Sequence, residues 1–489
     1  MTLFIALALS LVILFDAAYG AVILTAGLLL TGVALWAKNY LTEWFLGSLG
    51  VLLVGYAFFG RTFAYIGIPP LFVGEMVLGL GMLAFIAGRK IVAPIFRLPL
   101  VLLLVIYALW GCIRTIPYLE TYGITALRDG VIWGYFIFSV LIVAGLYRTA
   151  WTSYVPSLYS KCIVPFLIWV PVITIGSKVF GEDVLLFQGF KPGDAAVHLT
   201  GIATFLILNI HQTIRQPNDV LNVNVREWGY WILWLFGFFL LVTQSRSSFL
   251  MVVISLSFVF LMYPLGRWGK PVLVCLFLGF LGFVMNIEVD IGDVRKVSTR
   301  QALENVVSIL SSEDVNVSEL KGTKEWRLNW WEAIIQYTFG GKYFWLGKGF
   351  GVNLADADGF QVIEEGAPLR SPHNGHLTIL ARAGVPGFIL WVLLQIGFAV
   401  QMVYVYVQSS KYHQDLCKKL SIWVLAYWSA CMINSSFDVY LEGPQGGIWF
   451  WSIMGFGFAV TLLQKRGYEQ LLIKQSMITP PPMLAQEKG

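Results

Sequence analysis

Charged residues are scarce in this sequence: they make up 12% of its 489 residues, whereas 57% of the residues are hydrophobic. An ordinary globular protein carries roughly a quarter charged residues. Apolar runs of about 20 residues recur along the chain, and a helix of that length crosses the hydrocarbon core of a bilayer. The composition therefore excludes a soluble multi-domain protein.

Cysteine is also rare, and internal repeats and low-complexity tracts are missing. No CxxC pair occurs, and none of the cysteines lies in the largest polar segment, so neither a disulfide framework nor a zinc site is indicated. The five cysteines are Cys112, Cys162, Cys275, Cys417 and Cys431. No basic stretch precedes the first apolar run, Leu3 to Leu14, so we expect a first span there and not a cleaved signal peptide.

The formal net charge of +5 does not indicate nucleic-acid binding. The lysines and arginines lie in short clusters between apolar runs, not in one patch, and this pattern is typical of membrane topology. We predict an all-α fold: a polytopic transmembrane helix bundle of about 12 to 14 spans. The expected spans lie near residues 3–19, 20–37, 42–60, 68–88, 98–115, 130–147, 160–177, 197–213, 227–243, 247–264, 271–287, 376–407, 420–437 and 445–463.

The basic residues also predict the orientation of the bundle, because short cytoplasmic loops hold more lysine and arginine than external ones. With the N-terminus inside, the basic clusters fall on the cytoplasmic side, and both termini are cytoplasmic. Four regions follow: N-terminal transmembrane helices (1–287), one large extracytoplasmic or periplasmic loop (288–375), C-terminal transmembrane helices (376–463) and a cytoplasmic tail (464–489).

Two short helices are expected inside the large loop, at Arg300 to Leu310 and Trp326 to Phe339. The second one combines several Trp and Tyr residues with apolar ones, as interfacial helices do, so we expect it to lie at the membrane surface. The polar stretch between them, 311–324, lacks periodicity and is expected to be a connection.

Arginines on the external side need an explanation, since the topology rule disfavours them there. A guanidinium group stays charged at any relevant pH and binds phosphate oxygens through two parallel hydrogen bonds, so a cluster of them would suit a lipid pyrophosphate. The alternative for each is an interfacial anchor or a pair with a nearby acid such as Asp129. The candidates are Arg128, Arg246, Arg327, Arg370 and Arg382.

Two histidines end the large loop in the segment RSPHNGH, residues 370–376. Pro372 and Gly375 indicate a turn that directs His373 to the external cavity, with His376 about one helical turn further on. Histidine transfers protons near neutral pH, so His373 is a candidate for proton transfer or acceptor orientation. Helix capping and packing remain alternatives, and metal binding through HxxH lacks a convincing third ligand. His376 is a candidate contact to substrate, although a structural role is favoured.

Several carboxylates lie on the same predicted side. Asp438 and Glu442 occupy another external turn, where they could orient an acceptor hydroxyl or form a salt bridge. Asp356 and Asp358 form a DxD sequence, which holds a metal and a nucleotide sugar in soluble glycosyltransferases. In a glycine-rich external loop, where nucleotide sugars are not expected, we interpret it as a solvated loop.

The order of these motifs resembles the O-antigen ligase and polymerase superfamily of polytopic membrane glycosyltransferases. The resemblance covers most of the chain. It rests on SRSSF at Arg246, on WRLNWWEAI and WLGKGFG on either side of residue 340, on SPHNGHLTILARAGVPGF at His373 and on FDVYLEGPQGG at Asp438. Each motif is weak alone, but their order around one long external loop is fairly specific.

The resemblance implies a metal-independent, inverting transfer of a glycan from undecaprenyl pyrophosphate to an acceptor hydroxyl, without a cofactor. Arg246 and Arg327 would hold the pyrophosphate, and His373 would act as base or orient the acceptor. Fixed positive charge can replace a metal because pyrophosphate is already a good leaving group. The implied partners are the lipid-linked donor, a glycan or lipid acceptor and membrane lipids, in a bacterial inner membrane.

The motifs do not separate a ligase, which passes a finished chain to a lipid core, from a polymerase, which passes a growing chain to another repeat unit. The single histidine-bearing loop leads us to favour a ligase. A transporter or flippase for the same lipid-linked glycan would require polar residues in the middle of many helices and often repeated halves. Here the polar groups gather at one side, which favours an enzyme.

Overall fold

The computed structural model describes residues 40–68, 71–88, 93–149, 151–180, 190–210, 223–264, 267–285, 288–289, 297–298, 318–364 and 367–478. The described residues form an all-α bundle, as the sequence predicts, with three two-residue hairpins as the only strands among them. The two spans expected before residue 38 and the helix expected at Arg300 to Leu310 lie outside the described residues.

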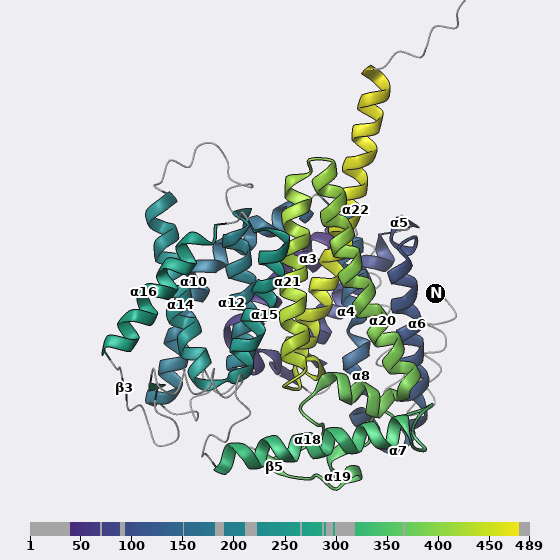
Figure 1. The fold of residues 1–489 in the computed structure, drawn as a ribbon. Coiled ribbons are helices and arrows are strands. Elements are labelled where there is room, and N and C mark those ends of the chain that lie inside the picture. Colours follow the sequence, from purple (N-terminus) through teal and green to yellow (C-terminus); the bar gives the residue numbers. More distant parts are fainter. Residues whose placement is uncertain are drawn as a thin grey trace, which may run out of the picture.

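Each of the twelve spans predicted after residue 40 coincides with a helix (Figure 1). The helices before the large loop are α3 (Leu41–Ala64), α4 (Val73–Ala87), α5 (Ala93–Phe96), α6 (Pro99–Thr115), η1 (Ile116–Tyr118), α7 (Leu119–Tyr122), α8 (Ile124–Gly134), α9 (Phe136–Arg148), α10 (Trp151–Phe180), α12 (Pro192–Ile207), α14 (Val223–Gln244), α15 (Arg246–Met262) and α16 (Gly269–Met285). Those after it begins are α18 (Ser318–Phe339), α19 (Leu354–Asp358), α20 (Gly375–Lys411), α21 (Asp415–Ser435), η2 (Tyr440–Glu442) and α22 (Pro444–Ile478).

Within the described residues, six stretches are long and apolar enough to cross a membrane. A seventh candidate is the pair α8 and α9, which is bent by 47° at Tyr135, and α4 and α15 are shorter apolar helices. The chain is therefore a multi-pass membrane protein, while the total of 12 to 14 spans remains a prediction. The six stretches are Leu41–Ala64, Pro99–Tyr122, Tyr154–Phe180, Gly375–Lys411, Asp415–Ser435 and Pro444–Gly467.

Burial separates central helices from outer ones. In the most apolar stretch of α22, 89% of the residues are buried, against 33% in α20. The outer helices α3, α6 and α20 expose large apolar side chains, among them Val51, Leu102 and Val400. Such side chains match the hydrocarbon phase of a bilayer. The helices α12, α21 and α22 therefore form the centre of the bundle.

The hairpins pair β1 (Gly67–Ile68) with β2 (Leu71–Phe72), β3 (Glu288–Val289) with β4 (Val297–Ser298), and β5 (Ile363–Glu364) with β6 (Ala367–Pro368), all antiparallel. The helix predicted from Trp326 begins earlier, at Ser318, so the expected connection at 311–324 is wrong for residues 318–324. Likewise, α22 continues to Ile478, beyond the predicted end of the last span at 463.

Candidate functional site

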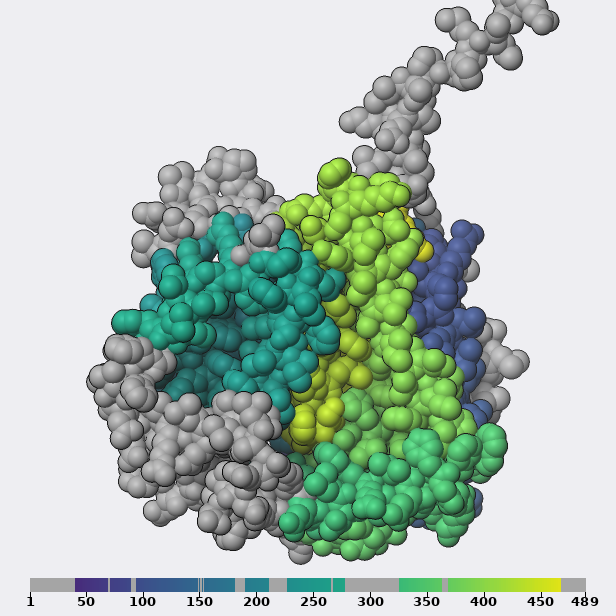
Figure 2. Space-filling view, viewed as in Figure 1, coloured from purple at the N-terminus to yellow at the C-terminus, as the bar shows by residue number. Residues whose placement is uncertain are grey.

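The helix α18 lies across one end of the bundle and not along it (Figure 1). Trp330, Ile334 and Thr338 are fully buried and follow one another at intervals of four residues, which places them on one helical face. This face packs on Leu354 and Ala355 of α19 and on Leu380, Ala381 and Val385 of α20. Figure 2 shows the segment around α18 covering the lower end of α20.

A break inside α20 shapes the same end. Gly384 has φ 71° and ψ −178°, so the helix interrupts its hydrogen bonds there, and only glycine adopts this conformation readily. The carbonyls of Ala381 and Arg382 accept instead from the N–H groups of Lys348 and Gly349, at 2.7 and 3.0 Å. The break therefore binds the glycine-rich segment WLGKGFG to the helix that follows His373.

The turn before α20 holds His373 in an uncommon conformation, with φ 51°. Helix capping, one alternative role for this histidine, belongs to its neighbour: the Asn374 side chain accepts from the N–H groups of His376 and Leu377, both at 3.1 Å. Trp331 of α18 donates to the carbonyl of Pro372 at 2.8 Å. Contacts on both sides thus fix the orientation of the turn.

Asp438 lies beside His373, with Oδ1 3.7 Å from Nδ1 of the ring. Lys191 donates to both oxygens of the Asp438 carboxylate, at 2.9 and 2.7 Å. Burial opposes ionisation of this carboxyl group, but His373, Lys191 and the N–H of Val439 together hold its pKa below the usual range. Asp438 is therefore ionised, and it is paired with a lysine that the candidate set did not include.

Arg327 of α18 reaches the same turn. Its Nη1 donates to the carbonyl of Phe437 at 3.4 Å, next to Asp438. Its Nε is buried and has no acceptor among the described residues. The guanidinium group therefore keeps donors for a ligand at the place where Asp438 and His373 meet.

Arg246 is the first residue of α15, and the packing of this helix fixes its level in the bundle. Ser255 of α15 accepts from Ser429 of α21 at 2.9 Å, while Met262 at the other end of α15 accepts from Tyr406, near the end of α20. The end of α15 therefore lies near the start of α21, and α15 and α21 run in opposite directions. Arg246, at the start of α15, thus lies at the end of the bundle where α21 leads to Asp438.

Lys191, Arg327, His373 and Asp438 form a polar cluster at this end of the bundle. Asp194, at the start of α12, extends it. It is half-buried, and its Oδ1 accepts from Asn434 at 3.1 Å. Burial raises its pKa to about 6, while the charges of Lys191 and Arg61 oppose this shift and Asp438 adds to it. The motifs in the sequence did not identify Asp194 or Asn434. Lys191 could have been identified, because it is a lysine on the predicted external side, where the topology rule disfavours basic residues.

Two of the arginines predicted to bind substrate are bonded to the protein itself. Arg382 is 1% exposed and lies 2.9 Å from Asp129, which also accepts from Arg370 at 2.9 Å. Arg382 donates further to the carbonyl of Val352 at 2.9 Å. These contacts favour the alternative role, in which the arginines pair with Asp129 and join the large loop to α8 and α20.

Arg128 and His376, two further predicted substrate contacts, lie apart from this pairing. Arg128 is exposed on α8. His376 has both ring nitrogens occupied, since Nδ1 accepts from Trp391 at 3.2 Å and Nε2 lies 3.1 Å from the carbonyl of Met432. The contacts of His376 match the structural role that was favoured for it.

The interpretation of the DxD sequence as a solvated loop is wrong for its second carboxylate. Asp358 is 1% exposed and forms an ion pair with Lys348. It also accepts from Trp330 at 2.6 Å and from Tyr337 at 3.3 Å. The ion pair between Asp358 and Lys348 of the glycine-rich segment could not be predicted from the composition around Asp358.

From the polar cluster toward the middle of the bundle, a cavity of about 650 Å³ opens between α3, α9, α10, α12 and the last two helices. Its walls are almost entirely apolar, and they include Phe58, Phe166 and Trp449. His198 also lines it, one helical turn along α12 from Asp194. The cavity is therefore suited to an apolar chain, and its lining comes within one helical turn of Asp194.

An apolar helix bundle with arginine, histidine and carboxylate side chains gathered at one end defines a multi-pass membrane protein with a polar site at its surface. Residues 231–392 match the family model described as O-Antigen ligase. This match confirms the resemblance to the O-antigen ligase and polymerase superfamily that the motifs indicated, and it supports a general role as an enzyme. It includes Arg246, Arg327 and His373 but ends before Asp438. No curated protein matches the chain.

Proposed function

We propose that this protein transfers a glycan from undecaprenyl pyrophosphate to an acceptor hydroxyl on the outer face of a bacterial inner membrane, as an O-antigen ligase does. One observation carries the proposal: Arg327, Asp438 and His373 come from three separate segments and meet at one turn. This arrangement supports a reaction in which Arg327 binds phosphate next to His373 as the base.

In this proposal His373 takes the proton of the acceptor hydroxyl. A carboxylate beside Nδ1 favours the ring tautomer with its proton on that nitrogen, which leaves Nε2 as the base. The contact of 3.7 Å would shorten as the ring gains charge. Asp438 would then stabilise the imidazolium ion, and Lys191 keeps Asp438 ionised.

Arg327 and Arg246 would hold the departing pyrophosphate. Negative charge grows on the bridging oxygen as the bond between the sugar and the phosphate breaks, and fixed guanidinium groups stabilise that charge. The acceptor oxygen attacks the anomeric carbon from the opposite side, which inverts its configuration. Undecaprenyl pyrophosphate leaves, and no metal is required for this step.

We propose that the apolar cavity is the binding site of the undecaprenyl tail. Its walls suit an isoprenoid chain, and its position one turn from Asp194 would bring the pyrophosphate to the polar cluster. This arrangement supports a donor that enters sideways from the bilayer. In the proposed topology, both termini of the protein lie on the cytoplasmic side.

The experiment is a reconstituted assay of the purified protein with a defined undecaprenyl-pyrophosphate oligosaccharide and a chelator. Lipid-core and repeat-unit acceptors are offered separately, and free undecaprenyl pyrophosphate is measured. Release with a glycosylated lipid core establishes a ligase. Release with a longer lipid-linked glycan establishes a polymerase of the same superfamily, which is the second candidate. Glycan that crosses the membrane unchanged would instead establish a transporter.

A further inference from the structure

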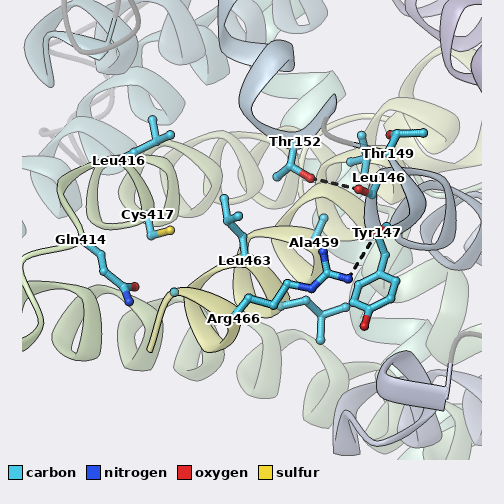
Figure 3. Close-up of a pocket in the computed structure, with 12 residues that line it drawn as sticks. Leu146, Tyr147, Thr149, Thr152, Gln414, Leu416, Cys417, Ala459, Leu463 and Arg466 are labelled. Carbon is cyan, nitrogen blue, oxygen red and sulfur yellow. Dashed lines mark hydrogen bonds between the residues drawn. The ribbon is translucent and has the colours of Figure 1, made fainter. Parts of the chain in front are cut away.

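A second cavity lies at the opposite end of the bundle. The helix α20 is 37 residues long and runs from the turn of His373 to Lys411, and Gln414 follows it. Gln414 lines a cavity of about 440 Å³ between the end of α9 and the start of α10 on one side and α21 and α22 on the other. Figure 3 shows the residues of this cavity.

One cation stands at the mouth of the cavity. The guanidinium carbon of Arg466 lies 3.7 Å from the centre of the Tyr147 ring, and Nη2 donates to the Tyr147 carbonyl at 3.4 Å (Figure 3). Stacking on the ring fixes the plane of the guanidinium group, while most of its N–H donors have no acceptor within the described part of the chain. A fixed, charged donor set of this kind suits a phosphate group.

Hydrogen-bond acceptors lie on both sides of the cavity. Oε1 of Gln414 is buried and accepts no hydrogen bond within the described part of the chain, while its Nε2 donates to the Gln464 carbonyl at 3.3 Å. The hydroxyl group of Thr152 donates to the Leu146 carbonyl at 3.4 Å and keeps its oxygen lone pairs. A ligand that satisfies Gln414 must therefore carry a hydroxyl or amine donor in addition to its phosphate.

The remaining wall is apolar, formed by Leu146, Leu416, Leu462 and Leu463. A lipid presents all three features together: a phosphate, a headgroup with a donor, and an acyl chain. Lys465 and Lys418 add positive charge at the same end, which disfavours a zwitterionic headgroup whose ammonium ion would face these lysines.

We propose that this cavity binds an anionic phospholipid with a hydroxylated headgroup, of the phosphatidylglycerol type. The phosphate binds Arg466, a glycerol hydroxyl donates to Oε1 of Gln414, and an acyl chain lies along the leucines. The lipid would join α9 and α10 to α21 and α22 at the end of the bundle away from the polar cluster.

Native mass spectrometry of the purified full-length protein tests this, with phosphatidylglycerol and phosphatidylethanolamine titrated separately. We expect phosphatidylglycerol to bind about tenfold more tightly, and Arg466→Gln to remove that preference. Lys465→Gln is the matched control: it removes the same charge one residue away, from an exposed side chain that does not line the cavity. It should change the affinity less than about twofold.

Equal losses in the two variants, or no loss in Arg466→Gln, would overturn the proposal, because the lipid would then respond only to general charge. A second variant, Gln414→Glu, keeps Arg466 and should exclude the anion, so unchanged binding by that variant also counts against the site. Glycerol 3-phosphate is the final arm. If it displaces the lipid at equal concentration, the cavity recognises a free phosphate and the lipid assignment is wrong.

Discussion

Oδ1 of Asp438 lies 3.7 Å from Nδ1 of His373, and both oxygens of this carboxylate accept hydrogen bonds from Lys191. The three residues come from the loop after α21, the turn before α20 and the start of α12. Because they are far apart in the sequence, their meeting is a property of the fold. It assigns Asp438 the salt bridge that was one of its two predicted roles.

Asp438→Asn should lower kcat by about 100-fold and leave KM for the lipid-linked donor within about threefold, because the amide cannot stabilise the imidazolium ion. Steady-state kinetics in the reconstituted assay measure both constants. Asp356→Asn is the control, since Asp356 is an exposed carboxylate of the large loop at the same end of the bundle. An unchanged kcat in Asp438→Asn would remove the carboxylate from the proposed mechanism.

Arg327→Ala should abolish transfer, and Arg327→Lys should restore only part of it, because lysine lacks the planar fork that binds two phosphate oxygens. We expect the lysine variant to retain roughly 1 to 10% of kcat/KM, equivalent to a loss of about 1.4 to 2.7 kcal/mol in transition-state binding. Lys342→Ala removes an exposed cation close to the end of α18 and should be neutral. Full activity in Arg327→Ala would contradict the assignment.

The raised pKa of Asp194 predicts a stability difference that depends on pH. Its pKa is about 6 in the folded protein and 3.8 as the ordinary value, so the folded state binds the proton more tightly. The protein should lose stability as the pH rises from about 4 to 6 and remain at the lower level above that window. The loss is on the order of 3 kcal/mol.

Asp194→Asn removes this titration and can keep the hydrogen bond with Asn434. Thermal unfolding in detergent should therefore give the variant a higher Tm than the unsubstituted protein at pH 8 and a similar Tm at pH 4.5. A variant that is less stable at pH 8 would show that charge pairing with Lys191 outweighs the burial of Asp194.

The break in α20 predicts a steric effect at Gly384. A Cβ atom there would lie 2.7 Å from the Phe344 carbonyl oxygen and 2.8 Å from the Gly347 nitrogen, both backbone atoms. Gly384→Ala should lower the Tm strongly and reduce transfer by disordering the turn of His373. Gly359→Ala is a matched control: φ is 77° there, but a Cβ atom would meet nothing within 4 Å.

Both positions have a positive φ, but Gly359 (ψ 22°) lies in the left-handed helical region, whereas Gly384 (ψ −178°) lies in a region that is essentially restricted to glycine. The difference in stability between the two variants therefore reports the clash together with the greater backbone strain at the break. Equal stability of the two variants would mean that the glycine-rich segment is not bound to the break as described.

Removing the Arg382 side chain should lower the stability of the folded protein more than it changes the transfer reaction. Arg382→Met leaves Asp129 buried with Arg370 still as a cationic partner, so the cost should fall below the roughly 3 to 5 kcal/mol of a buried charge left without any partner. We expect low abundance in the membrane and a reduced Tm, with little change in KM for the folded fraction. A stable variant with a greatly raised KM would instead support the predicted role in substrate binding.

The helices were predictable from the sequence because apolar length alone determines where a chain can cross a bilayer. The turn at His373 was also predictable in outline, since Pro372 and Gly375 flank it. The pairing of Lys191 with Asp438 was not, because it joins segments whose proximity depends on helix packing. The pairing of Asp358 with Lys348 depends on how the glycine-rich loop folds back on itself, which its composition does not specify. Long-range ion pairs leave no periodic signal in a single sequence.

The central claim is that transfer depends on the cations and the histidine gathered at one end of the bundle. Its most direct test is the release of undecaprenyl pyrophosphate, in the presence of a chelator, by the unsubstituted protein and by Arg246→Ala, Arg327→Ala and His373→Ala at matched abundance. The account predicts release by the unsubstituted protein and none by the three variants. Normal release by all three variants would contradict it.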